Sequence, residues 1–195
     1  MAWYYLIYGL VLIAVSSALI RNGAWRQAFL RYYLPLLGLL LLVFVVFRSS
    51  TVDHDYQDYL YWFDSIVPES LSDVHWNHDP MFFLASWLAS SAGLSYRAVL
   101  AFYSTLALIF VFLFSSKVRN DRWLTLLLYL TFCHFFIEYE MTAIRAAVAI
   151  PLASLSLLAA LERKVAQSIF LFVLALAFHL SALAVLPLLI LFHCR

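Results

Sequence analysis

Charged side chains are scarce in this sequence. Asp, Glu, Lys and Arg make up 12% of its 195 residues, whereas 66% are hydrophobic, and the mean hydropathy is +0.92. A soluble globular domain has about 25% charged residues and about half apolar ones, so the composition excludes that class. Several apolar runs approach or exceed the ~18–20 residues that cross a bilayer as a helix. We therefore expect an all-α integral membrane protein, with residues 1–195 forming a single polytopic domain.

Three further absences narrow the function. The chain has only two cysteines, Cys133 within an apolar run and Cys194, which imply neither a disulfide framework nor a metal-binding knuckle. Lysine and arginine form no basic run and the net charge is +1, which argues against a nucleic-acid partner. The N-terminus lacks the basic segment and the cleavage site of a signal peptide, so residues 3–20 are expected to remain as a helix.

The distribution of charge predicts the topology. Short loops rich in Lys and Arg prefer the cytoplasm, and three short connections hold the basic excess. By alternation, the acidic segments at 53–79 and 138–140 are expected outside, together with the N-terminus. The basic residues of the three connections are Arg21, Arg26, Arg31, Lys117, Arg119, Arg122, Arg163 and Lys164.

Six spanning helices fit this alternation. Residues 80–93 are apolar but too short to span, and a crossing there would place the next basic connection outside. We therefore expect a re-entrant or interfacial half-helix at 80–93, preceded by a long external loop over about 48–79. Pro187 is expected to kink or end the last span, because proline lacks the N–H that a helix interior needs. The six spans are expected at about 3–20, 32–47, 96–116, 123–137, 142–161 and 165–186.

Arg145 and His179 are ionisable residues within these apolar runs, where charge is costly and usually has a task. Arg145 is expected about one turn, roughly 5 Å, below the outer end of its helix. His179 is expected roughly 21 Å above the inner end of a core about 30 Å thick. Glu138 ends the preceding helix on the outer side, and Asp55 and Asp79 belong to the external loop. The sequence thus predicts that separate parts of the chain place polar groups in one outward-facing layer.

Structural explanations stay open for these residues. Arg145 lies on one helical face with Glu138 and Thr142, so it can extend to the interface and pair with Glu138. His179 can be a packing histidine, and tyrosines and tryptophans near helix ends can be interface anchors. No metal is expected, because no ligand spacing specifies one among His54, Asp55, His75, His78 and Asp79.

Five short segments also match a known pattern in order and spacing. Arg48 with Asp55-Tyr56-Gln57-Asp58-Tyr59 resembles Arg…Asp-x-x-x-Tyr, and Asp79-Pro80-Met81-Phe82 is similar to Glu-Pro-Gly-Phe. Ile144-Arg145-Ala146 resembles Ile-Arg-Gln, and it is followed by the basic turn Glu162-Arg163-Lys164 and by Phe178-His179-Leu180-Ser181-Ala182-Leu183. These are segments of EpsG-like exopolysaccharide polymerases, a Wzy-type group, which the chain resembles from residue 48 to about 190. The chain departs from the family where Asp79 replaces Glu, Ala146 replaces Gln, and Asp53 and His54 replace a Gly-x pair.

The resemblance implies transfer of a glycan from a polyprenyl diphosphate to a hydroxyl of the next lipid-linked repeat. The reaction would take place at the external face of the bacterial inner membrane, without a cofactor. Arg145 would bind the diphosphate, because arginine offers a rigid fork of donors, and Asp55 or His179 would supply a base. The implied partners are the lipid-linked glycan, the bilayer, a flippase and a chain-length regulator. The implied substrate-binding residues are Arg48, Tyr59, Asp79 and Glu138, with Trp62 and Trp76 as further aromatic platforms.

Two other classes of function stay open. A transporter or flippase of lipid-linked sugars would use the same polar layer, but it would also need polar residues through the midplane, and the runs 34–47 and 96–114 carry almost none. A non-catalytic subunit of an assembly complex is favoured only by the short length. Members of the family are typically about twice as long, so the resemblance implies that this chain corresponds to their N-terminal half.

Overall fold

The computed structural model describes Gly9, Tyr32 and residues 34–47, 55–65, 79–117 and 143–193. In these residues all regular structure is helical and no strand is present, which confirms the all-α part of the predicted fold class. The span expected at 123–137 lies outside the described residues, as do Arg48 and Glu138, and only Gly9 of the span expected at 3–20 is described. The elements are α3 (Leu34–Val46), α4 (Asp55–Ser65), α5 (Pro80–Ser91), α6 (Tyr96–Lys117), α8 (Ile144–Leu161), α9 (Val165–Phe178), the 3-10 helix η4 (Leu180–Val185) and α10 (Leu186–His193).

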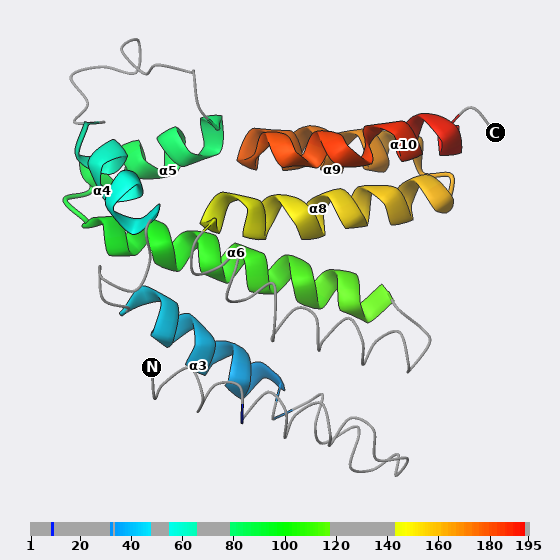
Figure 1. Cartoon of the computed structure of the whole chain (residues 1–195). Helices are drawn as coiled ribbons and strands as arrows, with labels where there is room; N and C mark the ends of the chain where they lie inside the picture. Colours follow the sequence, from blue (N-terminus) through cyan, green and yellow to red (C-terminus); the bar gives the residue numbers. More distant parts are fainter. Residues whose placement is uncertain are drawn as a thin grey trace.

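Helix α8 lies at the centre of the packing. It contacts α6, α9, η4 and α10, and Figure 1 shows α6, α8 and α9 stacked with their long axes roughly aligned. Most of the buried residues of α8 are small, such as Ala149 and Ala153, and small residues let helix backbones approach closely. The Ser156 hydroxyl donates a hydrogen bond of 2.8 Å to the carbonyl of Ser168, which joins α8 to α9.

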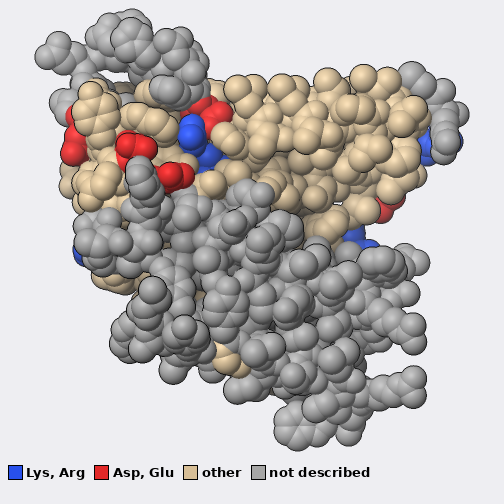
Figure 2. Space-filling view, in the orientation of Figure 1, with Lys and Arg blue, Asp and Glu red and all other residues tan. Residues whose placement is uncertain are grey.

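Charged side chains of the described residues lie at the two ends of this stack. Figure 2 shows Lys, Arg, Asp and Glu at both ends, with uncharged surface between them. Helix α6 has no charged residue between Arg97 and Lys117, and α8 has none after Arg145. Both helices are long and apolar enough to cross a membrane, and among the described residues they are the only two that meet that test. Together these features support a membrane protein. They do not confirm the six predicted spans.

The last predicted span is wrong, because α9 ends at Phe178 and not near Leu186. His179 is extended, with φ −166° and ψ 138°, and the chain then continues as η4 and α10. Figure 1 shows that these two elements double back beside α9, and η4 contacts both α8 and α9. Pro187 is the second residue of α10 and does not break a helix. Proline is well tolerated in a first turn, where its missing N–H would have no intrahelical partner.

The predicted half-helix is present as α5, whereas the predicted external loop contains a helix, α4. Asp55 and Asp58 lie in the first turn of α4, where negative charge is favourable near the positive end of the helix dipole. Tyr56 and Tyr59 are its buried residues and pack against Tyr96 and Phe82, with ring centroids 5.4 Å apart in each pair. This aromatic packing fixes α4 against α5 and α6, over the end where α8 begins (Figure 1).

Candidate functional site

The ends of three helices meet at one carboxylate. Asp79 immediately precedes α5, Arg145 is the second residue of α8, and His179 follows α9. Nη1 of Arg145 lies 2.6 Å from Oδ2 of Asp79, and Nδ1 of His179 lies 2.7 Å from the same oxygen. One atom therefore joins residues that are far apart in the sequence.

The position of Asp79 is unusual for an acidic residue. It stands at the N-cap of α5, yet its side chain makes no capping hydrogen bond with that helix. Instead the carboxylate points to Arg145 and His179, and only 6% of the side chain is exposed. Pro80 occupies the first position of α5, which reduces the need for a cap because proline has no N–H to satisfy. The Asp79 carboxylate is therefore available to contact Arg145 and His179 and is not needed to cap α5.

Aromatic rings enclose the guanidinium of Arg145. Its Cζ atom lies 5.2 Å from the centroid of the Tyr59 ring and 5.0 Å from that of Trp62, which is within cation–π range. Its Nε also donates a hydrogen bond of 3.3 Å to the Tyr59 hydroxyl. Nε and Nη1 are thus both engaged with protein groups, and a guanidinium carries five N–H donors in all. The cage fixes the orientation of Arg145, and its contacts with the described residues leave donors for a ligand.

The cluster consists of Asp79, Arg145, His179, Tyr59 and Trp62. Of the first three residues, His179 is the most accessible, with 30% of its side chain exposed. An ionised carboxylate only accepts hydrogen bonds, so the Nδ1 atom that faces Asp79 carries the hydrogen. The Nε2 atom of a neutral His179 is then an acceptor, held in a fixed direction. A carboxylate that sets the tautomer and orientation of an imidazole in this way is the arrangement found in catalytic triads. His179 is therefore suited to accept a proton.

The structure brings Arg145, His179 and Asp79 into contact, as the sequence predicts. Arg145 lies in the first turn of α8, because that helix begins at Ile144 and not one turn earlier as expected. Its partner in the structure is Asp79, whereas Glu138, the partner considered from the sequence, lies outside the described residues, as does Arg48.

The two predicted site residues of α4 differ in their surroundings. Tyr59 is only 3% exposed, and its ring and hydroxyl both contact Arg145. Asp55 begins the helix one turn before Tyr59 on the same face. Among the described residues, no three His, Cys, Asp or Glu side chains are grouped as a metal site would require.

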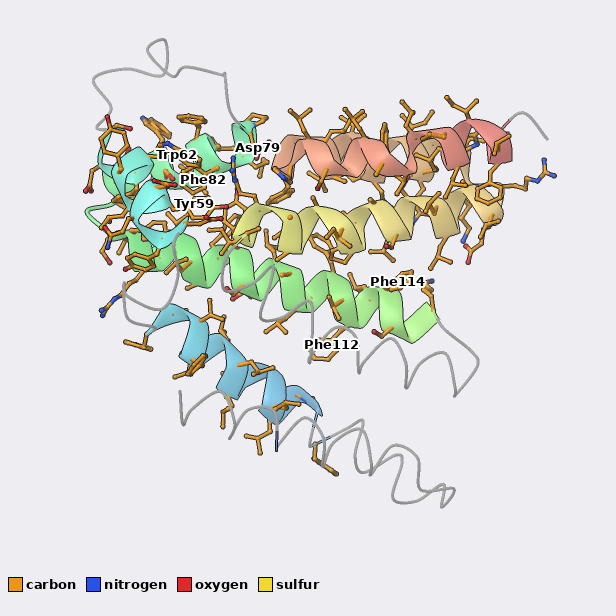
Figure 3. All side chains as sticks on the ribbon, viewed as in Figure 1. Tyr59, Trp62, Asp79, Phe82, Phe112 and Phe114 are labelled. Atoms are coloured by element: carbon orange, nitrogen blue, oxygen red, sulfur yellow. The ribbon has the colours of Figure 1, made fainter. Side chains whose placement is uncertain are left out.

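Two aromatic residues at this end of the stack have contacts that were not predicted from the sequence. Trp62 was expected to be a sugar platform, but it packs on Arg145 and on Phe82, with ring centroids 6.1 Å apart in the latter pair. Figure 3 shows Tyr59, Trp62, Asp79 and Phe82 together at one end of the stack, well away from Phe112 and Phe114. Tyr103, whose ring contacts Phe82, carried no signal because it is an uncharged residue in an apolar run. The spacing of Tyr59 and Trp62, which places them on one helical face, could have indicated the Arg145 cage.

Comparison with known proteins gives one finding. The model of the family described as "EpsG family" matches residues 31–194, which include all the residues of the cluster. No curated protein and no solved structure matches the chain.

Proposed function

Because the chain belongs to the EpsG family, which points to a polysaccharide-polymerase-like role, we propose that it joins polyprenyl-diphosphate-linked oligosaccharide repeats into exopolysaccharide or O-antigen. The observation that carries this proposal is the single Asp79 oxygen that contacts both Arg145 and His179. It holds a cation suited to a leaving diphosphate beside an imidazole suited to activate a hydroxyl. Glycan transfer needs both groups within reach of one reacting carbon.

Arg145 would stabilise the leaving group. When the bond between the anomeric carbon and the diphosphate oxygen breaks, negative charge accumulates on that oxygen, and fixed donors aimed there lower the barrier. The guanidinium is always charged and binds phosphate oxygens through parallel hydrogen bonds. Asp79 and the Tyr59–Trp62 cage hold it in place before substrate binds. Its position in the first turn of α8 adds the positive end of a helix dipole.

His179 would act on the acceptor. Its Nε2 would take the proton of the attacking sugar hydroxyl as that oxygen forms the new bond to the anomeric carbon. The glycan then leaves its diphosphate carrier and continues on the acceptor's carrier, and the proton passes from His179 to solvent. Asp79 would stabilise the imidazolium formed in this step through its contact with Nδ1. Asp79 is thus a positioning residue, and Asp55 is the other candidate base.

The site would lie at the external face of the bacterial inner membrane. The cluster occupies the end of the stack with Asp55, Asp58 and Asp64, while Lys117, Arg163 and Lys164 lie at the opposite ends of α6 and α8. Short basic loops prefer the cytoplasm, which supports an external location for the cluster. A diphosphate in the headgroup layer would be level with Arg145 while its polyprenyl chain stayed in the bilayer.

The experiment that tests this function is deletion of the gene, followed by analysis of the length ladder of surface glycan. Loss of a polymerase leaves single repeats on the surface, because export of each repeat continues. Loss of a flippase leaves no repeat outside. We expect single repeats and no long chains, with long chains restored by the wild-type gene. An empty ladder would support the flippase alternative, and an unchanged ladder would contradict both functions.

Arg145→Lys separates binding of a diphosphate from a mere need for positive charge. Lysine keeps the charge and a long stem, but it lacks the planar fork of donors. The loss of one charge-assisted hydrogen bond costs about 1.5–3 kcal/mol, which is roughly tenfold to over a hundredfold in rate. We expect normal protein abundance and sharply shortened glycan, measured by two blots on the same cells. The matched control is Arg97→Lys, an exposed arginine near the same end of the stack, which should give a wild-type ladder. A wild-type ladder from Arg145→Lys would return Arg145 to a structural role.

A further inference from the structure

Next to the cluster lies a buried hydroxyl for which the described residues provide no hydrogen-bond partner. Tyr103 of α6 is 0% exposed, and its hydroxyl oxygen has no hydrogen-bond partner among the described residues. Leaving a buried polar group unsatisfied is costly, and phenylalanine would fill nearly the same space without that cost. The hydroxyl therefore calls for a partner that the described residues do not supply.

The ring of Tyr103 is fixed by the same segments that carry the site. It makes edge contacts with Phe178, at 5.5 Å between ring centroids, and tilted contacts with Phe82, at 6.2 Å. Phe178 directly precedes His179, and Phe82 lies one turn after Asp79. Tyr103 is also within electrostatic range of Arg145, Asp79 and Tyr59. A third helix thus brings a polar atom to the buried side of the cluster.

We propose that the Tyr103 hydroxyl is a substrate-binding group that donates a hydrogen bond to an oxygen of the diphosphate held by Arg145. This inference rests on the proposed function. A phenol is a neutral donor whose position is fixed by its ring, so it adds a directed bond to an anion without adding charge to a buried site. In this arrangement the diphosphate lies between the guanidinium of α8 and the phenol of α6. Binding of substrate satisfies the hydroxyl that the described residues leave without a partner.

The test measures how tightly the purified wild-type protein, in nanodiscs of neutral lipid, binds farnesyl diphosphate and farnesol. Farnesol has the same prenyl chain and lacks the diphosphate. Tyr103→Phe should weaken the binding of farnesyl diphosphate by about tenfold or more, because a hydrogen bond to a charged group is lost. Its affinity for farnesol and its melting temperature should not fall. Ser115→Ala is the matched control, since it removes another buried hydroxyl without a described partner about 18 Å further along α6, and it should change neither affinity.

Each result of these binding and melting measurements either supports or overturns the role proposed for Tyr103. Wild-type affinity for farnesyl diphosphate in Tyr103→Phe overturns it, and so does a lower melting temperature, because the hydroxyl would then have a structural partner. Equal weakening of farnesol binding overturns the proposal as well, since the effect would not depend on the diphosphate. Arg145→Ala separates the two levels of inference. If that variant binds farnesyl diphosphate weakly while Tyr103→Phe binds it normally, only the role of Tyr103 fails. If both bind it normally, the diphosphate site itself fails.

Discussion

His179→Asn should abolish long glycan chains while leaving the protein at normal abundance in the membrane. The carboxamide nitrogen of asparagine lies close to the position of Nδ1 in histidine, so the hydrogen bond to Asp79 can persist. Asparagine has no atom at the position of Nε2 and cannot accept a proton from a sugar hydroxyl. General base catalysis contributes about 10²–10⁴-fold to a rate, so we expect a loss of that order.

The measurement is the length ladder in cells that carry the substitution in the chromosomal gene, beside a blot for the protein. His193→Asn is the matched control, because His193 is an exposed histidine at the far end of α10. It should leave the ladder unchanged. Long chains from His179→Asn at normal abundance would exclude His179 as the base and would favour Asp55.

The meeting of Arg145, His179 and Asp79 could be predicted because depth in a membrane follows from position along a helix. Each residue lies at a countable distance from a span end, and charged or polar residues within apolar runs are few enough to compare. The same reasoning could not identify the partner of Arg145. It favoured Glu138, which is near in sequence, whereas the contact to Asp79 depends on how α5 packs against the ends of α8 and α9.

The helix break at His179 could not be predicted from composition. Residues 165–186 are apolar apart from Gln167, Ser168, His179 and Ser181, so hydropathy indicates one continuous span with Pro187 as its natural end. The structure breaks the helix where His179 turns to Asp79, and Pro187 fits the first turn of the next helix. Irregular backbone at membrane depth is tolerated where it lies against protein or a cavity, and that condition depends on tertiary packing.

Helix α4 was missed for a different reason. Its sequence mixes aromatic and acidic residues, which was interpreted as an external loop, although Tyr56 and Tyr59 are buried. The burial becomes visible only when α5 and α6 supply the aromatic partners Phe82 and Tyr96. Trp62 was expected to contact sugar, and the structure shows it packed on Arg145 and Phe82.

Asp79→Asn should have an effect as large as that of His179→Asn, because it acts on two partners at once. Asparagine preserves the shape of the side chain and removes its charge, so Arg145 loses its ion pair and the His179 imidazolium loses its stabilising neighbour. Replacing the aspartate of a catalytic triad by asparagine lowers the rate by about 10⁴-fold through the wrong histidine tautomer. We expect a loss of about 10²–10⁴-fold here. Asp79→Glu restores a carboxylate, and glutamate is the residue that the resembling family segment carries, so that variant should retain long chains.

The central claim is that one carboxylate at position 79 organises Arg145 and His179 for glycan transfer. It is tested most directly by the glycan length ladder of Asp79→Asn beside that of Asp79→Glu, each normalised to the amount of protein in the membrane. Asp64→Asn, at an exposed position of α4, controls for the loss of a negative charge near the same end. The structure leads us to expect single repeats from Asp79→Asn and long chains from Asp79→Glu and Asp64→Asn. Long chains of wild-type length from Asp79→Asn would contradict the claim.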